Sequence, residues 1–108
     1  MPLTQSEREG HVLLQVSGGL TIFQAAEYKP QLLHAIDGAD AMLELDLNGV
    51  DELDTAGLQL LFLLKREADA QYKRLHISGV SAEVQDVFDM LRLQAHFGVA
   101  ASAGREAV

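Results

Sequence analysis

The stretch from Ala41 to Leu47 constrains the fold more than any other, because its leucines alternate strictly with other residue types. Leu43, Leu45 and Leu47 alternate with Met42, Glu44 and Asp46. A period of two is typical of a β-strand that buries one face against a core. We expect the opposite face of this strand to present Glu44 and Asp46 to water or to a partner.

Strand patterns and helix patterns alternate along the rest of the chain. Strands are predicted at residues 11–16, 20–22, 41–47, 74–78 and 97–101, and helices at residues 24–36, 55–71 and 82–91. Pro30 lies inside the first helix and predicts a kink or a late start near Lys29, because proline lacks the amide hydrogen and clashes with the preceding turn. Strands separated by helices need crossover connections, so the sheet should be partly parallel. The sequence therefore predicts one α/β domain over residues 1–108, with frayed tails at residues 1–9 and 102–108.

Charge and composition argue against several functional classes. The chain has 16 acidic and 8 basic side chains, for a net charge of −8, and the basic residues form no stripe that would bind nucleic acid. The most apolar run, Leu58–Leu64, is about a third of the ~20 residues that span a bilayer, so we expect no direct membrane insertion. The chain has no cysteine, which excludes disulfides and thiol catalysis. The polar amino terminus does not resemble a signal peptide, and we expect a cytoplasmic protein.

The helix predicted after Asp54 carries apolar residues on nearly every side. They are Leu58, Leu60, Leu61, Phe62, Leu63 and Leu64. A helix that is apolar all round is normally buried on more than one side, which favours a central helix packed between its neighbours. The alternative is that part of this surface meets a second protein, since a small domain has difficulty covering a whole helix.

The loop before this helix is the densest polar feature of the sequence. It contains Asn48, Gly49, Asp51, Glu52, Asp54, Thr55 and Gly57. In open α/β sheets, functional groups collect beyond the carboxyl ends of the strands, and the turn from Gly79 to Ser81 leaves a second such end. Either Asp54 or Thr55 can cap the helix, because both side chains accept hydrogen bonds from its first amides. Thr55 is then either a plain cap or a hydroxyl acceptor for a modifying group.

Other chemistries fit the residues poorly. The acids of this loop lack the spacing of a calcium-binding loop, and no histidine lies near them. A phosphate-accepting Asp46 would need an acid pair after the first strand and a late lysine, and the sequence has neither. The serines lack a Gly-x-Ser-x-Gly setting, and Gly18-Gly19 lacks the sequel of a phosphate loop. We therefore expect no catalytic residue, metal or cofactor, and no enzymatic activity.

Four short stretches of the chain form a pattern that resembles a known family. They are Gly19-Leu20-Thr21, Leu45-Asp46-Leu47-Asn48-Gly49-Val50, Leu53-Asp54-Thr55-Ala56-Gly57-Leu58 and Ile77-Ser78-Gly79-Val80. Together they resemble the STAS domain, the module shared by anti-sigma factor antagonists and sulphate transporters, over nearly the whole chain. The resemblance implies a small mixed sheet of about four or five strands, with the helices packed mainly on one face.

The resemblance also implies a bacterial signalling role. In family members that switch partners, a cognate kinase phosphorylates the serine or threonine that follows the aspartate, and the matching residue is Thr55. The implied function is a regulatory phosphoprotein of transcription that binds an anti-sigma factor or Ser/Thr kinase. The implied partner-binding residues are Asp54, Ala56, Gly57, Leu58 and Gly79. Gly57, which has no side chain, would let a partner approach closely.

Two residues of the pattern depart from many antagonists and leave an alternative open. Threonine stands at position 55 where many have serine, and Ala56 stands where a second serine is common. Threonine at this place also occurs in the STAS subunit of lipid-asymmetry ABC transporters. The alternative function is therefore a subunit of a lipid-transport ABC complex that binds its ATPase. The sequence does not determine the oligomeric state.

Overall fold

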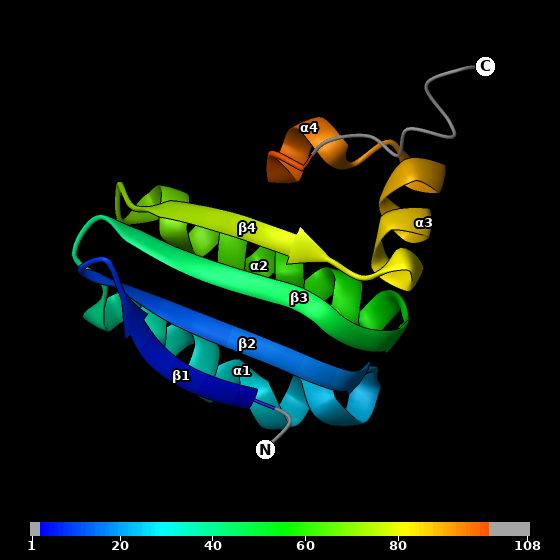
Figure 1. Cartoon of the computed structure of the whole chain (residues 1–108), viewed down its shortest axis with the longest axis horizontal. Helices are drawn as coiled ribbons and strands as arrows, with labels where there is room; N and C mark the ends of the chain where they lie inside the picture. The colour runs from blue at the N-terminus through cyan, green and yellow to red at the C-terminus, as the bar shows by residue number, and fades with distance from the viewer. Residues whose placement is uncertain (1–2, 100–108) are drawn as a thin grey trace.

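The computed structural model describes residues 3–99 as a four-stranded sheet with four helices (Figure 1). In chain order the elements are β1 (Leu3–Arg8), β2 (His11–Leu20), α1 (Ile22–Gly38), β3 (Met42–Leu53), α2 (Thr55–Ala70), β4 (Arg74–Val80), α3 (Ala82–Leu91) and α4 (Gln94–Phe97). The strand order is β1-β2-β3-β4, with β1 antiparallel to β2 and the other neighbours parallel. The predicted α/β class and the mixed, partly parallel sheet are confirmed.

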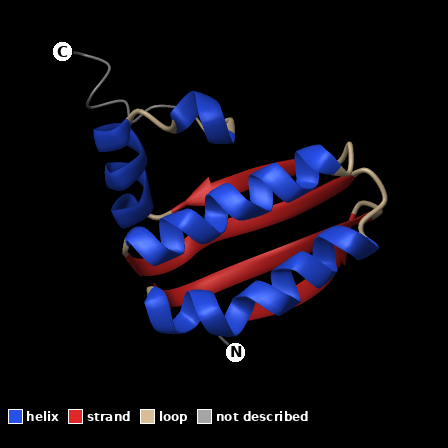
Figure 2. Ribbon diagram, turned by 180° about the vertical axis from the view of Figure 1, so that it is seen from behind, coloured by secondary structure: helices blue, strands red, loops and turns tan. Residues whose placement is uncertain are grey.

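Helices α1 and α2 lie side by side on one face of the sheet, and the opposite face carries no helix in the part of the chain that is described (Figure 2). The core fills the space between these two layers. Its fully buried side chains include Leu14, Leu20, Leu32, Ile36, Leu43, Leu45, Leu47, Leu61 and Leu64. Burying one face of each strand in this way produces the alternation seen between residues 41 and 47. The prediction of helices mainly on one face is confirmed.

Helix α2 packs against several neighbours, as its apolar sequence predicts. Leu58, Leu60, Leu61 and Leu64 are buried. The ring of Phe62 reaches toward α4, where its centroid lies 5.3 Å from that of His96 and 5.4 Å from that of Phe97. Phe62 and Leu63 are only half-buried, so a short apolar strip of α2 faces outward. None of the helices described between residues 3 and 99 has the length and apolar character needed to cross a membrane.

The prediction of a frayed amino-terminal tail is wrong for residues 3–8, which form strand β1. β1 pairs with β2 along its full length, from Leu3 opposite Val16 to Arg8 opposite His11. The backbone between the strands turns through Glu9 and Gly10, which have φ angles of 51° and 86°. Only Leu3 of this strand is buried. The strand is therefore held by backbone pairing in a hairpin, which leaves little hydrophobic pattern in the sequence.

The structure differs from the sequence prediction at the carboxyl end of β2 and in α1. The predicted short strand at residues 20–22 does not form, because β2 continues to Leu20 and α1 begins at Ile22. Helix α1 runs through Pro30 without interruption and does not start late. Pro30 is exposed, so the carbonyl group of the preceding turn that loses its amide partner lies on the solvent side of the helix.

Three further strand ends differ from the prediction. β3 continues through Asn48 and Gly49 to Leu53, because β2 still pairs with it there. β4 continues through Gly79 to Val80. The strand predicted at residues 97–101 does not form over its first part, since Phe97 ends helix α4. Residues 100–101 and the predicted tail at 102–108 lie outside the described residues.

Candidate functional site

The carboxyl ends of β2 and β3 meet beside the first turns of α1 and α2, and most of the predicted site residues lie at this corner. Leu20 pairs with Leu53 at the end of the two strands. The amide of Asp54 then donates a hydrogen bond of 3.4 Å to the carbonyl oxygen of Leu20. Because a helix follows each of the two strands immediately, the two helix N-termini are held next to each other.

Asp54 connects these two helix N-termini through one carboxylate. Its Oδ1 accepts a hydrogen bond of 2.9 Å from the amide of Gly57, in the first turn of α2. Its Oδ2 accepts one of 3.0 Å from the amide of Ile22, the first residue of α1. A negative charge is favourable at the positive end of a helix dipole, and here it serves two helices at once. The cap of α2 is therefore Asp54, and the interpretation of Thr55 as a plain cap is wrong.

Thr55 occupies the first position of α2, with its side chain exposed. Asp54 already accepts the capping hydrogen bond, so the fold does not need the Thr55 hydroxyl for that role. Asp51 and Glu52, also exposed, precede it in the last residues of β3. A phosphoryl group on this hydroxyl would lie at the positive end of α2, which favours an anion, and close to acids that repel one.

Gly57 and Leu58 are buried and Ala56 is half-buried, so these predicted partner residues support the corner from within. A side chain at Gly57 would overlap the carbonyl oxygen of Leu20, and its Cβ would lie 2.9 Å from Cδ1 of Leu53. The space beside Gly57 is thus filled by β2 of the same chain. The absence of a side chain at Gly57 lets the two helix N-termini approach each other. The sequence alone suggested that a partner would approach there.

Gly79 lies apart from this corner. It pairs with Asp46, and the strand continues from there for roughly 20 Å to Leu53. The side chain of Asn48 fills the space beside Gly79, so that a Cβ there would overlap it. Asn48 is itself fixed, because its backbone and side-chain amides both donate to Oδ1 of Asp46 at 2.9 Å. A partner contact at Gly79 stays a prediction.

The corner also carries two exposed apolar side chains that sequence analysis did not single out. Ile22 and Phe23, the first residues of α1, are 61% and 81% exposed. A groove between α1 and α2 begins beside Ile22 and Ala56. The sequence does contain a signal for the start of α1, because Thr21 followed three residues later by Gln24 is a capping-box pattern. In the structure the amide of Thr21 donates to Oε1 of Gln24 at 3.1 Å.

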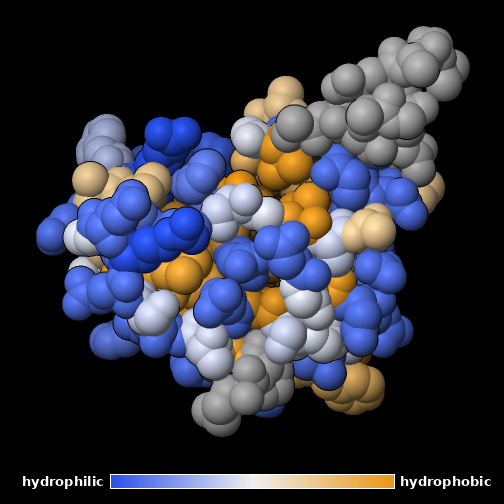
Figure 3. Space-filling view, viewed as in Figure 1, coloured by the Kyte–Doolittle hydropathy of each residue, from blue (hydrophilic) through white to orange (hydrophobic). Residues whose placement is uncertain are grey.

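A second polar cluster lies on the helix-free face of the sheet, around Glu44. Figure 3 shows this face, where hydrophilic side chains surround smaller hydrophobic areas. Oε1 of Glu44 lies 2.6 Å from Nε2 of His11, and Oε2 lies 3.2 Å from Nη1 of Arg8. Hydrogen bonds from His11 and Ser78, together with the charge of Arg8, lower the pKa of Glu44 although burial opposes this shift.

The expectation that Glu44 faces water or a partner is therefore wrong. Its side chain is only 6% exposed, because Arg8 and His11 of the β1–β2 hairpin cover it. Asp46, on the same face, is half-buried and accepts a hydrogen bond of 3.4 Å from Nε2 of Gln15. Glu44 is thus covered in part by Arg8 of strand β1, the element that the sequence did not predict.

Comparison with known proteins places this fold in context. A family model described as "Mlab, STAS domain" matches residues 3–99. The fold resembles the Bacillus cell fate determinant SpoIIAA in its phosphorylated form, with a TM-score of 0.69 and 18% identity over 97% of this chain and 95% of that chain. It also resembles an anti-sigma factor antagonist from Mycobacterium paratuberculosis, with a TM-score of 0.80 and 14% identity over 95% and 87%.

A protein of the sulfate transporter family from Wolinella succinogenes shares the fold as well, with a TM-score of 0.66 and 19% identity over 80% of this chain and 70% of that chain. At these identities the similarity concerns the fold alone. The family match extends over nearly all of the described residues and includes both helix N-termini of the corner.

Proposed function

This chain belongs to the STAS domain family, and we propose that it is a non-enzymatic, anti-sigma factor antagonist-like module switched by phosphorylation of Thr55. The observation that carries the proposal is the division of roles between Asp54 and Thr55. Asp54 caps α2, and Thr55 is exposed beside it. The hydroxyl is thus accessible to a kinase, and its modification leaves the capping hydrogen bonds in place. The phosphorylated form of SpoIIAA, a protein of the same fold, gives further support.

The proposed docking surface is the corner formed by the first turns of α1 and α2. Ile22 and Phe23 supply exposed apolar area, and Thr55 lies beside them at the start of α2. Asp54, Ala56, Gly57 and Leu58 hold this surface in shape. The proposed partner is an anti-sigma factor or a Ser/Thr kinase in the cytoplasm.

Phosphorylation would change the charge of this surface more than its shape. It adds roughly −1.5 to −2 charges to a residue that closely follows Asp51 and Glu52 at the end of β3. The helix N-terminus offsets this repulsion by only about 0.3–1 kcal/mol. A tenfold change in partner affinity needs about 1.4 kcal/mol, which a phosphate at the centre of an apolar contact can supply. The fold therefore persists while an apolar or acidic partner surface is repelled.

We expect the Thr55→Ala variant to fold normally and to take up no phosphate from the cognate kinase and ATP. The side chain makes no buried contact that alanine would remove, since Thr55 is exposed. Phosphopeptide mass spectrometry measures the modification. Thr4→Ala, which alters an exposed threonine on β1, is the matched control and should be phosphorylated like the wild type. Phosphate mapped to any residue other than Thr55 would contradict the assignment.

We expect Phe23→Ser to weaken partner binding at least about tenfold, because a large exposed aromatic side chain at the centre of an interface contributes ~1–3 kcal/mol. The affinity is measured by isothermal titration calorimetry with the captured partner. Tyr72→Ser is the control, since Tyr72 is 97% exposed and lies beyond the opposite end of α2. Equal losses of partner affinity in the two variants would contradict the assignment of the corner as the docking surface.

A second candidate is a subunit of a lipid-transport ABC complex that binds its ATPase. It is favoured by Thr55, since the resemblance associates threonine at this place with such subunits. The two candidates differ in the partner that a tagged chain captures from its source cells. Capture of an ATP-binding-cassette subunit would support the transporter function and contradict the sigma-factor one. Capture of a kinase-type anti-sigma factor would do the reverse.

A further inference from the structure

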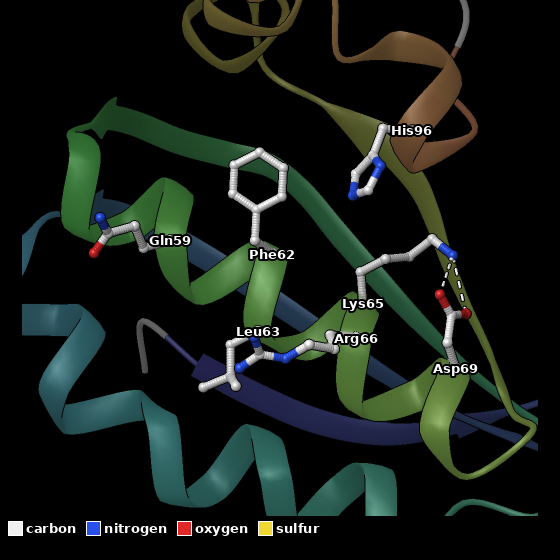
Figure 4. Close-up of a pocket in the computed structure, with 7 residues that line it drawn as sticks. All are labelled: Gln59, Phe62, Leu63, Lys65, Arg66, Asp69 and His96. Carbon is white, nitrogen blue, oxygen red and sulfur yellow. Dashed lines mark hydrogen bonds and ion pairs between the residues drawn. The ribbon is translucent and has the colours of Figure 1, made fainter.

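A groove between α2 and α4 combines an apolar floor with cationic walls, and the proposed switch does not use it (Figure 4). Its volume is about 570 Å³. It is lined by Gln59, Phe62, Leu63, Lys65, Arg66, Asp69 and His96. The first six belong to α2 and recur at helical spacing, so they form one stripe along that helix, and His96 approaches from α4.

The apolar floor of this α2–α4 groove consists of half-buried side chains. Phe62 and Leu63 lie there, and the ring of Phe62 contacts that of His96 at a centroid distance of 5.3 Å. Figure 4 shows Phe62 and His96 pointing toward each other across the groove. These side chains offer apolar area to an occupant without any rearrangement of the core.

The charges around the groove are opposite to those of the whole chain. Lys65 and Arg66 line it, against Asp69 as the one acid among its described lining residues. Both carboxylate oxygens of Asp69 accept from Nζ of Lys65 at 3.0 and 2.9 Å, so these two charges offset each other and Arg66 gives the lining its net positive charge. Arg66 is exposed and forms no ion pair with the described residues.

The positive region extends beyond the groove itself. A neighbouring hollow shares Lys65, Asp69 and His96 with it and adds Lys73 and Arg74. Four of the eight Lys and Arg residues of a chain with net charge −8 therefore lie on this side of the molecule. Such an asymmetry orients an acidic partner toward this side, because the field elsewhere is repulsive.

We propose that the α2–α4 groove binds an acidic amphipathic helix of a protein partner. Apolar side chains on one face of that helix pack on Phe62 and Leu63, and its flanking carboxylates pair with Arg66 and share Lys65 with Asp69. The lining residues on α2 extend from Gln59 to Asp69, about three helical turns, which suits a helix; a small amphiphile needs about 70–90% of its surface enclosed. The site does not include Thr55, so the chain can hold this partner whether or not Thr55 is modified.

The test uses two fluorescein-labelled peptides of about 16 residues, each about 24 Å long as a helix. Both carry leucine at i, i+3, i+4 and i+7, and the remaining positions are mostly Glu in one peptide and Lys in the other. We expect the Glu peptide to bind the wild-type chain in fluorescence anisotropy at least about tenfold more tightly than the Lys peptide. Its affinity should fall as salt rises from about 0.05 to 0.5 M.

The variant Lys65→Gln/Arg66→Gln should bind the Glu peptide at least about tenfold more weakly than the wild type. Lys29→Gln/Arg92→Gln is the matched control, since it removes the same charge from exposed residues outside the groove and should bind normally. Circular dichroism verifies that both variants are folded, and Arg66→Gln alone serves if the double variant is not.

Three outcomes would overturn this inference. They are equal binding of the two peptides, equal losses in the groove variant and its control, and no binding of the Glu peptide at millimolar concentration. Laurate, a single-chain anionic amphiphile, is the competing occupant. If laurate shifts the amide resonances of Phe62 and His96 and the Glu peptide does not, the groove is a lipid site and the helix is excluded. Because none of these measurements involves Thr55 or a kinase, failure here leaves the proposed function unaffected.

Discussion

Replacing Gly57 with alanine is expected to lower the free energy of unfolding by about 3 kcal/mol, since overpacking a close contact costs this much when the neighbour cannot move. The new Cβ would overlap the carbonyl oxygen of Leu20 and lie 2.9 Å from Cδ1 of Leu53. The carbonyl belongs to the backbone at the end of β2 and cannot rotate away. Either α2 or the end of β2 must then shift. Asp54 then cannot keep both of its hydrogen bonds, to the amides of Ile22 and Gly57.

Urea unfolding followed by circular dichroism measures this effect. Gly38→Ala is the matched control, because it adds the same methyl group where nothing lies within 4 Å. Gly38 is the last residue of α1, so alanine there should raise stability by about 0.4–1 kcal/mol. If the two variants unfold at the same urea concentration, the helix N-termini are not in close contact, and the rigid corner proposed as the docking surface does not exist.

The elements that could be predicted from the sequence are those whose stability is encoded locally. Helix α3 begins and ends where predicted, because Ser81 caps it, accepting a hydrogen bond of 3.2 Å from the amide of Val84. The strand at residues 41–47 was recognised because one of its faces is buried in the core. A helix cap and the alternation of apolar residues in a strand both depend on residues close together in the chain, so they can be recognised in a single sequence.

The features that were missed depend on contacts between distant residues. Strand β1 is one of them, since its pairing with β2 leaves a single buried side chain. The burial of Glu44 is another, because it follows from Arg8, which lies 36 residues away in the chain. The alternation around Glu44 predicts only that it lies on the face opposite the core. Which element covers that face is a tertiary property.

The candidate site was predicted only in part, because some of its contacts join residues that are distant in the sequence. The segment Asp54–Leu58 can be recognised from the residues themselves, and as the cap and first turn of α2 it does lie at the carboxyl end of a strand. The sequence did not reveal that Leu20 and Ile22, from another strand end, complete the corner. Nor did it reveal that the same chain fills the space beside Gly57. Gly79 was grouped with the corner because both follow strands, but β3 extends well beyond β4.

Glu44→Gln is expected to lower the free energy of unfolding by about 2 kcal/mol at pH 7, because it removes a buried charge that pairs with Arg8 and is hydrogen-bonded to His11. The value is below the full cost of breaking a buried ion pair, since the Arg8 side chain is 59% exposed and returns to water. His76, the β4 neighbour of Glu44, and Ser78 complete the surroundings on the opposite side. Glutamine keeps the shape of the side chain, so the loss reports on charge.

The same variant should show a distinct dependence on pH. Because the folded state lowers the pKa of Glu44, its contribution to stability is complete above the ordinary pKa of 4.5 and is lost as pH falls through the lowered value. The gap in unfolding free energy between wild type and Glu44→Gln should therefore be constant near neutrality and close below pH 4.5. Urea unfolding at a series of pH values measures it, with Glu52→Gln as an exposed control that should show no such gap. A gap that persists at the lowest pH would mean that glutamine disturbs the hydrogen bonds around position 44, and that the charge of Glu44 does not stabilise the hairpin. The β1–β2 hairpin would then be held independently of charge, and acid would not loosen it from β3.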